Sequence, residues 1–190
     1  MKRLFIAIHV SPEPALFNLL EMLKTELSNE RINWVKPANM HLTLKFLGSV
    51  AEAQIPVIND AVRECISGFE PLALQFDKTG IFGSRYEPRV LWLGQDKISP
   101  QLHSLANNLL DAMDTLGFIR DRQNFVPHLT LGRIKKLTDK KHFQEVIGNI
   151  PQKTYIQTRV DELILFESIL HKEGPQYLVQ QAFSLSKQGV

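Results

Sequence analysis

The chain has 190 residues, of which 44% are hydrophobic and 22% are charged, and its formal net charge is +2. This is the composition of an ordinary globular protein, and the weak basic excess excludes a polybasic nucleic-acid-binding arm while permitting an anionic substrate. A single cysteine, Cys65, excludes an internal disulfide and a cysteine-built zinc cluster, and we expect it to be a buried, unreactive thiol.

The N-terminal residues superficially resemble a signal peptide, because Met-Lys-Arg precedes an apolar run from Leu4 to Val10. The run is short and contains His9, and the Ser11-Pro12 pair that follows suits a helix start better than a cleavage site. No run approaches the roughly 18 apolar residues of a membrane-spanning helix. We therefore expect a cytoplasmic protein without membrane contact.

Hydrophobic periodicity predicts the secondary structure along the chain. Apolar or alternating runs predict strands over 4–8, 72–76 and 89–94, and further strands over 153–158, 160–167 and 177–185. The segment 79–88 is rich in Gly, Arg and Tyr, and we expect it to be an exposed loop. Leucine-rich helical spacing predicts helices over 12–27, 57–69, 100–116 and 138–150.

One four-residue word, H-L-T-L, occurs twice, at His41–Leu44 and at His128–Leu131. Alternate side chains of a strand point to the same side, so the His and the Thr of each word share one face while the leucines enter a core. Each half of the chain places this word after a helix, which suggests an internal duplication. The pattern predicts an α+β fold of two similar lobes that share one cleft.

Two histidines facing across a cleft suit phosphodiester cleavage. In-line attack on phosphorus needs a base on the incoming oxygen and an acid on the leaving oxygen, and histidine can serve as either. The hydroxyls of Thr43 and Thr130 can donate hydrogen bonds to the non-bridging oxygens. This scheme requires no metal ion and no cofactor.

Three residues near the words are further candidates for substrate binding. Arg133 is a candidate guanidinium clamp on phosphate, although strict alternation puts it on the face opposite His128 unless a bulge at Gly132 re-aims it. By the same parity Lys45 shares the face of His41. Phe46 occupies the place that matches Arg133, and we favour a core role for it over a base-stacking one.

Other aromatic and basic residues stay ambiguous between structure and function. Each of the three aromatic residues suits the core or a stacked base, and each of the two arginines suits an RNA backbone contact or a solvated loop. These residues are Trp34, Tyr86, Phe125, Arg85 and Arg89.

Two longer blocks, Asn33 to Gly48 and Phe125 to Arg133, resemble those of the 2H phosphoesterases. They are most similar to the bacterial RNA 2′,3′-cyclic phosphodiesterase branch, also called 2′-5′ RNA ligases, and the segments 3–8, 90–94 and 165–168 resemble it too. The resemblance implies a single bilobal catalytic domain over 1–190, with two interleaved lobes that each consist of an antiparallel sheet backed by helices around a central cleft.

The same resemblance implies an activity and a set of residue roles. The reaction is metal-independent hydrolysis of 2′,3′-cyclic phosphate ends of RNA, or of nucleoside 2′,3′-cyclic phosphates, to 2′-phosphates. The family's histidines correspond to His41, as proton donor to the departing 3′ oxygen, and His128, as proton acceptor from water. Its motif threonines correspond to Thr43 and Thr130. We expect the protein to act as a monomer.

Alternatives of other kinds stay open. A related enzyme with this catalytic pair would join RNA ends through a 2′-5′ linkage, or would cleave 2′-5′ oligoadenylate or ADP-ribose cyclic phosphate, because the pocket walls decide the substrate. A non-catalytic RNA-binding module would keep the cleft without the reaction. A zinc site is less favoured, since two histidines without a third ligand nearby make a poor set.

Overall fold

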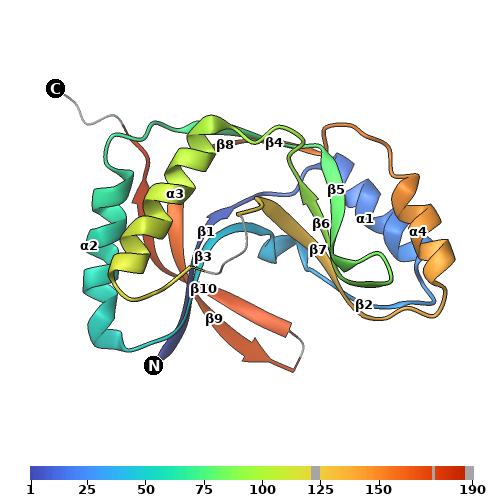
Figure 1. The fold of residues 1–190 in the computed structure, drawn as a ribbon, viewed down its shortest axis with the longest axis horizontal. Coiled ribbons are helices and arrows are strands. Elements are labelled where there is room, and N and C mark those ends of the chain that lie inside the picture. Colours follow the sequence, from blue (N-terminus) through green and yellow to red (C-terminus); the bar gives the residue numbers. More distant parts are fainter. Residues whose placement is uncertain (121–124, 173, 187–190) are drawn as a thin grey trace.

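The protein is described by a computed structural model that covers residues 1–120, 125–172 and 174–186. It has two lobes side by side, each built on four strands of one eight-stranded antiparallel sheet (Figure 1). In lobe 1 helices α2 and α3 cover the sheet. This lobe comprises, in strand order, β3 (His41–Val50), β1 (Lys2–His9), β9 (Glu162–His171) and β10 (Gly174–Ser184), with α2 (Ile55–Ile66) and α3 (Pro100–Thr115).

Lobe 2 has the same plan, with α1 and α4 beside each other on the outer side of its sheet (Figure 1). A short ribbon of β4 and β8 runs between the lobes. Lobe 2 comprises β2 (Arg31–Trp34), β7 (His128–Lys136), β6 (Glu87–Gly94) and β5 (Lys78–Ser84), with α1 (Pro14–Glu26) and α4 (Lys140–Gly148). The ribbon pairs β4 (Leu72–Phe76) with β8 (Ile156–Val160), and two 3₁₀ turns are η1 (Pro37–Asn39) and η2 (Glu52–Gln54).

The expected α+β, bilobal fold with helix-backed antiparallel sheets is confirmed, and so are the four expected helices. The first helix starts two residues later than expected, at Pro14 rather than Pro12. A proline disfavours the helical region for the residue before it, and Glu13 is accordingly extended, so the helix begins at Pro14. Ser99 caps α3, since its hydroxyl accepts a hydrogen bond from the Leu102 amide at 3.3 Å.

The expectation of an exposed loop over 79–88 is wrong, because β5 and β6 form a hairpin there. Its glycines serve close packing and a bend within the strand. Gly80 lies opposite Trp92, and the indole ring covers the place where a Cβ would stand. Gly83 has a φ of +98° at a register shift, a conformation that favours glycine. Glycine content alone therefore misled the prediction.

The two lobes meet at the strands that carry the repeated words. Strands β3 and β7 share one paired position, Leu42 opposite Leu129, and both leucines are fully buried. Neighbouring residues of a strand point to opposite faces, so this pair turns the histidine and the threonine of each word away from the core. The core beneath the seam is continuous from lobe to lobe and includes Leu44 and Leu131.

No helix in the described ranges has both the length and the apolar content that crossing a membrane requires.

The packing of Trp92 on Gly80 yields a stability prediction. In Gly80→Ala the new methyl group overlaps the indole ring, so we expect the free energy of unfolding to fall by about 1–3 kcal/mol. Urea denaturation measures this difference. The matched control is Gly148→Ala, where a Cβ meets nothing within 4 Å and no loss is expected. Equal stability of the two variants would contradict the proposed packing.

Candidate active site

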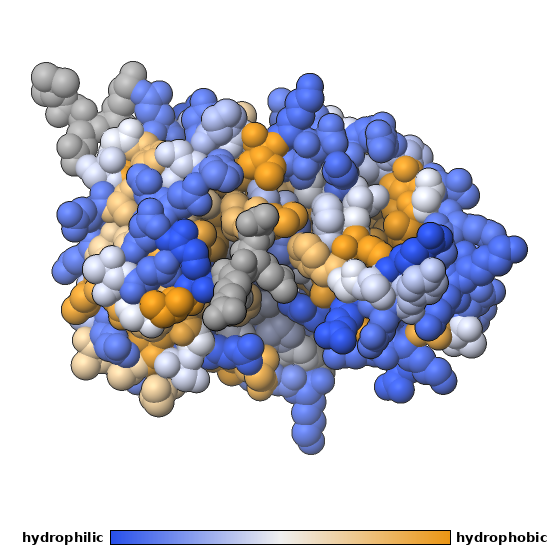
Figure 2. Space-filling model, in the orientation of Figure 1, coloured by the Kyte–Doolittle hydropathy of each residue, from blue (hydrophilic) through white to orange (hydrophobic). Residues whose placement is uncertain are grey.

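A cleft of about 1260 Å³ lies between the lobes, and both repeated words line it. Apolar residues lie around the middle of the molecule, and further apolar patches lie on both lobes (Figure 2). The side chains of His41, Thr43, His128 and Thr130 all line this one cleft. The seam between Leu42 and Leu129 thus brings both histidines to the same cavity.

His41, at the start of β3, is held by a backbone carbonyl group and by aromatic rings. Its Nδ1 lies 2.7 Å from the carbonyl oxygen of Asn39, which ends the 3₁₀ turn η1. The edge of Tyr177 meets the imidazole at a centroid distance of 5.0 Å and an angle of 83°, and Phe5 lies at 4.9 Å. The ring is therefore fixed on one side by a hydrogen bond and on the others by packing.

His128 has the corresponding environment at the start of β7. Its Nδ1 lies 2.7 Å from the carbonyl oxygen of Val126, again two residues earlier. Phe82 meets the imidazole edge-on at 4.7 Å and 86°, and Trp92 lies at 6.4 Å. The two lobes therefore hold their histidines in the same way.

The carbonyl partners determine which ring nitrogen carries hydrogen. A carbonyl oxygen only accepts hydrogen bonds, so Nδ1 of both His41 and His128 must be the donor. The neutral ring then presents Nε2 as an acceptor, and the charged ring presents it as a donor. Either imidazole can thus take or give a proton at Nε2.

The pKa of both imidazoles is lowered from the ordinary value of 6.5. Burial is the largest cause in each case, because it disfavours the charged ring, and the carbonyl hydrogen bond opposes it. The Arg133 guanidinium lowers the pKa of both rings further. His128 and His9 add to the effect on His41. The environment of both rings therefore favours the neutral form in the unliganded protein.

Matching bulges put a third residue of each word's strand on the cleft face. In β7 Gly132 pairs with Leu91 and Thr130 pairs with Trp92, so Leu131 is the extra residue. The sequence predicted this bulge at Gly132, one residue later than the observed position. The bulge turns Arg133 toward the cleft, as predicted. Arg133 lines the cleft together with Thr130. Among the described residues Arg133 makes no ion pair and neither motif threonine makes a side-chain hydrogen bond.

The equivalent bulge in β3 changes the interpretation of Lys45 and Phe46. Lys45 pairs with Ile6, whose side chain is in the core, so the parity that put Lys45 beside His41 is wrong. Lys45 instead lines the cleft on the side of α3. The pKa of Asp114 on that helix is lowered chiefly by its hydrogen bond from Arg120, and the charge of Lys45 adds to the effect. Phe46 is 52% exposed, lines the cleft and contacts Phe5 at 5.4 Å, so the expected core role is wrong.

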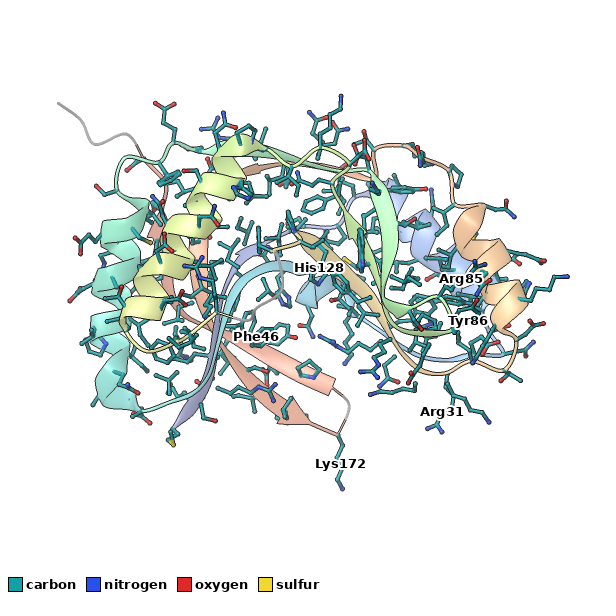
Figure 3. All side chains as sticks on the ribbon, viewed as in Figure 1. Arg31, Phe46, Arg85, Tyr86, His128 and Lys172 are labelled. Carbon is teal, nitrogen blue, oxygen red and sulfur yellow. The ribbon has the colours of Figure 1, made fainter. Side chains whose placement is uncertain are left out.

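The other ambiguous residues divide between the cleft and the surface. Trp34 and Phe125 line the cleft. Arg85 and Tyr86 lie at the turn of the β5–β6 hairpin beside α4, away from His128 (Figure 3), and Arg85 contacts Gln144 of that helix. Arg89 lies 3.6 Å from Glu87 on the exposed surface. The two arginines are therefore surface residues outside the cleft.

Sequence reasoning missed four aromatic residues beside the histidines. Two come from the hairpins at the outer edges of the sheets and two from strands next to the motif strands. A useful signal was the strand alternation in β1, which puts Phe5 on the face of His9. The four residues are Phe5, Phe82, Trp92 and Tyr177.

In the part of the chain that the structure describes, no three His, Cys, Asp or Glu side chains gather in a way that would hold a metal ion.

Comparison with known proteins agrees with this geometry. Two consecutive segments, residues 8–92 and 93–177, each match the LigT-like phosphoesterase family, and each contains one H-L-T-L word. The chain belongs to this family. The double match also agrees with the duplication inferred from the sequence.

Relatives of similar length share about a third of their residues with this chain. A Thermotoga maritima protein named RNA 2′,3′-cyclic phosphodiesterase is 34% identical, over 93% of this chain and 92% of its own. A Bacillus subtilis protein of the same name is 33% identical over 96% of both chains. These two relatives therefore align over nearly the whole molecule.

Solved structures show the same fold. The crystal structure of TT0787 from Thermus thermophilus superposes with a TM-score of 0.77 at 26% identity, covering 98% of this chain and 100% of that one. E. coli LigT, crystallised with 3′-AMP, gives a TM-score of 0.72 at 22% identity, covering 98% and 99%.

The position of Arg133 yields a prediction about both histidines. Replacing it in Arg133→Met removes a positive charge that disfavours both imidazolium rings, so we expect the pKa of His41 and of His128 to rise. NMR titration of the ring nitrogens measures both values. Arg89→Met, at the exposed pair with Glu87, is the control and should change neither. Unchanged titrations in Arg133→Met would contradict the charge assignment.

Proposed function

We infer that this protein is a hydrolase, an RNA 2′,3′-cyclic phosphodiesterase that converts 2′,3′-cyclic phosphate ends to 2′-phosphates. The observation that carries the proposal is the pair of histidines in one cleft, each with Nδ1 bonded to a carbonyl oxygen. The relatives from Thermotoga maritima and Bacillus subtilis have this name and align over nearly the full chain, which supports the same activity here.

The proposed reaction is in-line attack by water on the cyclic phosphate. Neutral His128 accepts a proton from water at Nε2 while the water oxygen bonds to phosphorus. The bond from phosphorus to the 3′ oxygen breaks, and His41 in its charged form gives that oxygen a proton. The product has a 2′-phosphate and a 3′-hydroxyl, and the two imidazoles have exchanged protonation states.

Fixed donors supply the charge stabilisation in this scheme. The hydroxyls of Thr43 and Thr130 and the guanidinium of Arg133 face the cleft, where the non-bridging oxygens of the phosphate would lie. Among the described lining residues there is no aspartate or glutamate, whereas lysines and arginines come from several elements. This charge balance supports an anionic substrate. We propose that the reaction needs no metal ion.

Phe46 and Lys45 are proposed to contact the nucleotide in different parts of the cleft. The exposed ring of Phe46 gives a surface on which a base can stack. Lys45 lies on the α3 side and would attract a phosphate of the RNA chain. A ligase reaction uses the same pair, with a 5′-hydroxyl in place of water, and product analysis separates the two reactions.

We further propose that the whole chain acts as one catalytic unit, in the cytoplasm and as a monomer. Each lobe provides one histidine to the same cleft, so neither lobe is sufficient and no second copy is needed to complete the pair. The single cysteine, Cys65, is half-buried, and burial raises the pKa of its thiol to about 11. An unreactive thiol and the absence of any disulfide suit a reducing compartment.

The direct test is hydrolysis of an oligonucleotide with a 2′,3′-cyclic end in excess EDTA. We expect a 2′-phosphate product, and a fall in kcat of about 10²–10⁴-fold in each of His41→Ala and His128→Ala. His142→Ala is the control, because that ring lies on α4 and bonds to the Glu26 carbonyl. Full turnover by either cleft variant, with an intact circular dichroism spectrum, would refute the two-histidine mechanism.

A second prediction concerns the pH dependence. His128 must be neutral, so kcat/KM rises as pH increases through its pKa. His41 must be charged, so kcat/KM falls as pH increases through its own pKa. Both values lie below 6.5 in the free protein, which puts the maximum of kcat/KM on the acidic side of pH 6.5.

The alkaline limb of the pH profile, where activity falls as His41 loses its proton, should shift when substrate binds. The bound phosphate anion favours the charged ring, so the alkaline limb of kcat lies at higher pH than that of kcat/KM. Steady-state rates from pH 4.5 to 9 determine both profiles. A maximum of kcat/KM above pH 8 would contradict the assignment.

A further inference from the structure

The β9–β10 hairpin extends beyond the sheet that carries it. Strand β1 pairs with β9 only from Ile164 to Glu167, whereas β9 and β10 continue to pair with each other to His171 and Gly174. The outer half of the hairpin therefore projects from lobe 1 (Figure 1). Its residues form one wall of the cleft, namely His171, Lys172, Gly174, Pro175 and Tyr177.

Asn39 connects this hairpin to His41 through two hydrogen bonds in opposite directions. Its side-chain Nδ2 donates to the Pro175 carbonyl oxygen at 2.9 Å, across 136 residues of sequence. Its own carbonyl oxygen accepts from His41 Nδ1 at 2.7 Å. The orientation of the Asn39 peptide thus depends on the hairpin, and the orientation of the imidazole depends on that peptide.

Tyr177 provides a second contact from the same hairpin. Its ring meets His41 edge-on at 5.0 Å and Phe5 at 5.0 Å and 73°. The imidazole is therefore enclosed between β1 and β10. Removal of the Tyr177 ring would open it to water, whereas removal of the Asn39 side chain would release its carbonyl partner.

Lobe 2 has the packing contact and lacks the hydrogen-bonded connection. The residue that corresponds to Asn39 is Val126, which gives His128 a carbonyl oxygen and has no side-chain donor. The residue that corresponds to Tyr177 is Phe82, at 4.7 Å from His128. The connection from hairpin to histidine is thus specific to His41, and His128 serves as an internal control.

We propose that the β9–β10 hairpin positions His41 for catalysis, with Asn39 and Tyr177 as positioning residues. The proposal rests on the proposed function, in which His41 gives a proton to the departing oxygen. Because the hairpin also lines the cleft, bound RNA would contact the same hairpin that orients the imidazole. Substrate fit in this wall is thereby coupled to the geometry of the proton donor.

NMR of the two imidazoles in the unliganded protein tests the positioning without an activity measurement. Asn39→Ala frees the carbonyl that favours the charged ring, so the pKa of His41 falls further and its Nδ1 hydrogen exchanges faster with water. Tyr177→Ala exposes the ring, so the pKa of His41 rises toward 6.5. Tyr177→Phe keeps the ring, as Phe82 does in lobe 2, and should behave as the unmodified protein.

Other groups that act on His41 are the same in all these variants: His9 on β1, and His128 and Arg133 on β7. In each variant the pKa of His128 should be the same as in the unmodified protein. Opposite shifts of His41 with an unchanged His128 support the proposal. Equal shifts of both histidines indicate a general loss of structure and overturn it, and so does an unchanged His41 in both alanine variants.

Kinetics then relate positioning to catalysis. In Asn39→Ala we expect kcat to fall about 10- to 100-fold, as for a displaced catalytic group, with KM changed less than about threefold. Asn149→Ala, at an exposed asparagine that follows α4 and does not line the cleft, is the matched control and should leave both constants unchanged. An unmodified protein without hydrolase activity would refute the proposed function and leave the NMR result to decide the positioning. Unchanged kcat in Asn39→Ala would refute the catalytic role of the hairpin.

Discussion

The pairing of Leu42 with Leu129 is the constraint on which the site depends. It is the one register position shared by β3 and β7, and both side chains are fully buried in the continuous core. Both leucines are the second residue of their strand, so antiparallel pairing at this point puts the starts of the two motif strands beside each other. Because neighbours along a strand alternate, burial of the leucines forces both histidines and both threonines into one cleft.

Paired bulges then differentiate two halves of common design. In each strand an extra residue puts the third position after the threonine on the cleft face: Arg133 in lobe 2 and Phe46 in lobe 1. A guanidinium suits phosphate and an aromatic ring suits a base. The pseudo-twofold body thus presents a chemically asymmetric cleft, as expected for a substrate whose two ends differ.

The sequence sufficed for the parts of the site that local patterns determine. The repeated words, their alternation and the helical leucine spacing predicted the bilobal fold and the cleft face of His41 and His128. Bulge positions were harder to predict, because strict alternation misplaced Lys45 and a bulge in β7 could only be assumed. The contacts of Tyr177 and Asn39 could not be predicted, since they join residues more than 130 positions apart whose pairing depends on the complete sheet.

A complex with uridine and vanadate tests the central claim most directly, because five-coordinate vanadium mimics phosphorus during in-line displacement. The account predicts a crystal structure in which Nε2 of His41 and Nε2 of His128 each lie about 3 Å from an apical oxygen, on opposite sides of one vanadium. A vanadate that contacts a single imidazole, or two imidazoles on the same side, would contradict it.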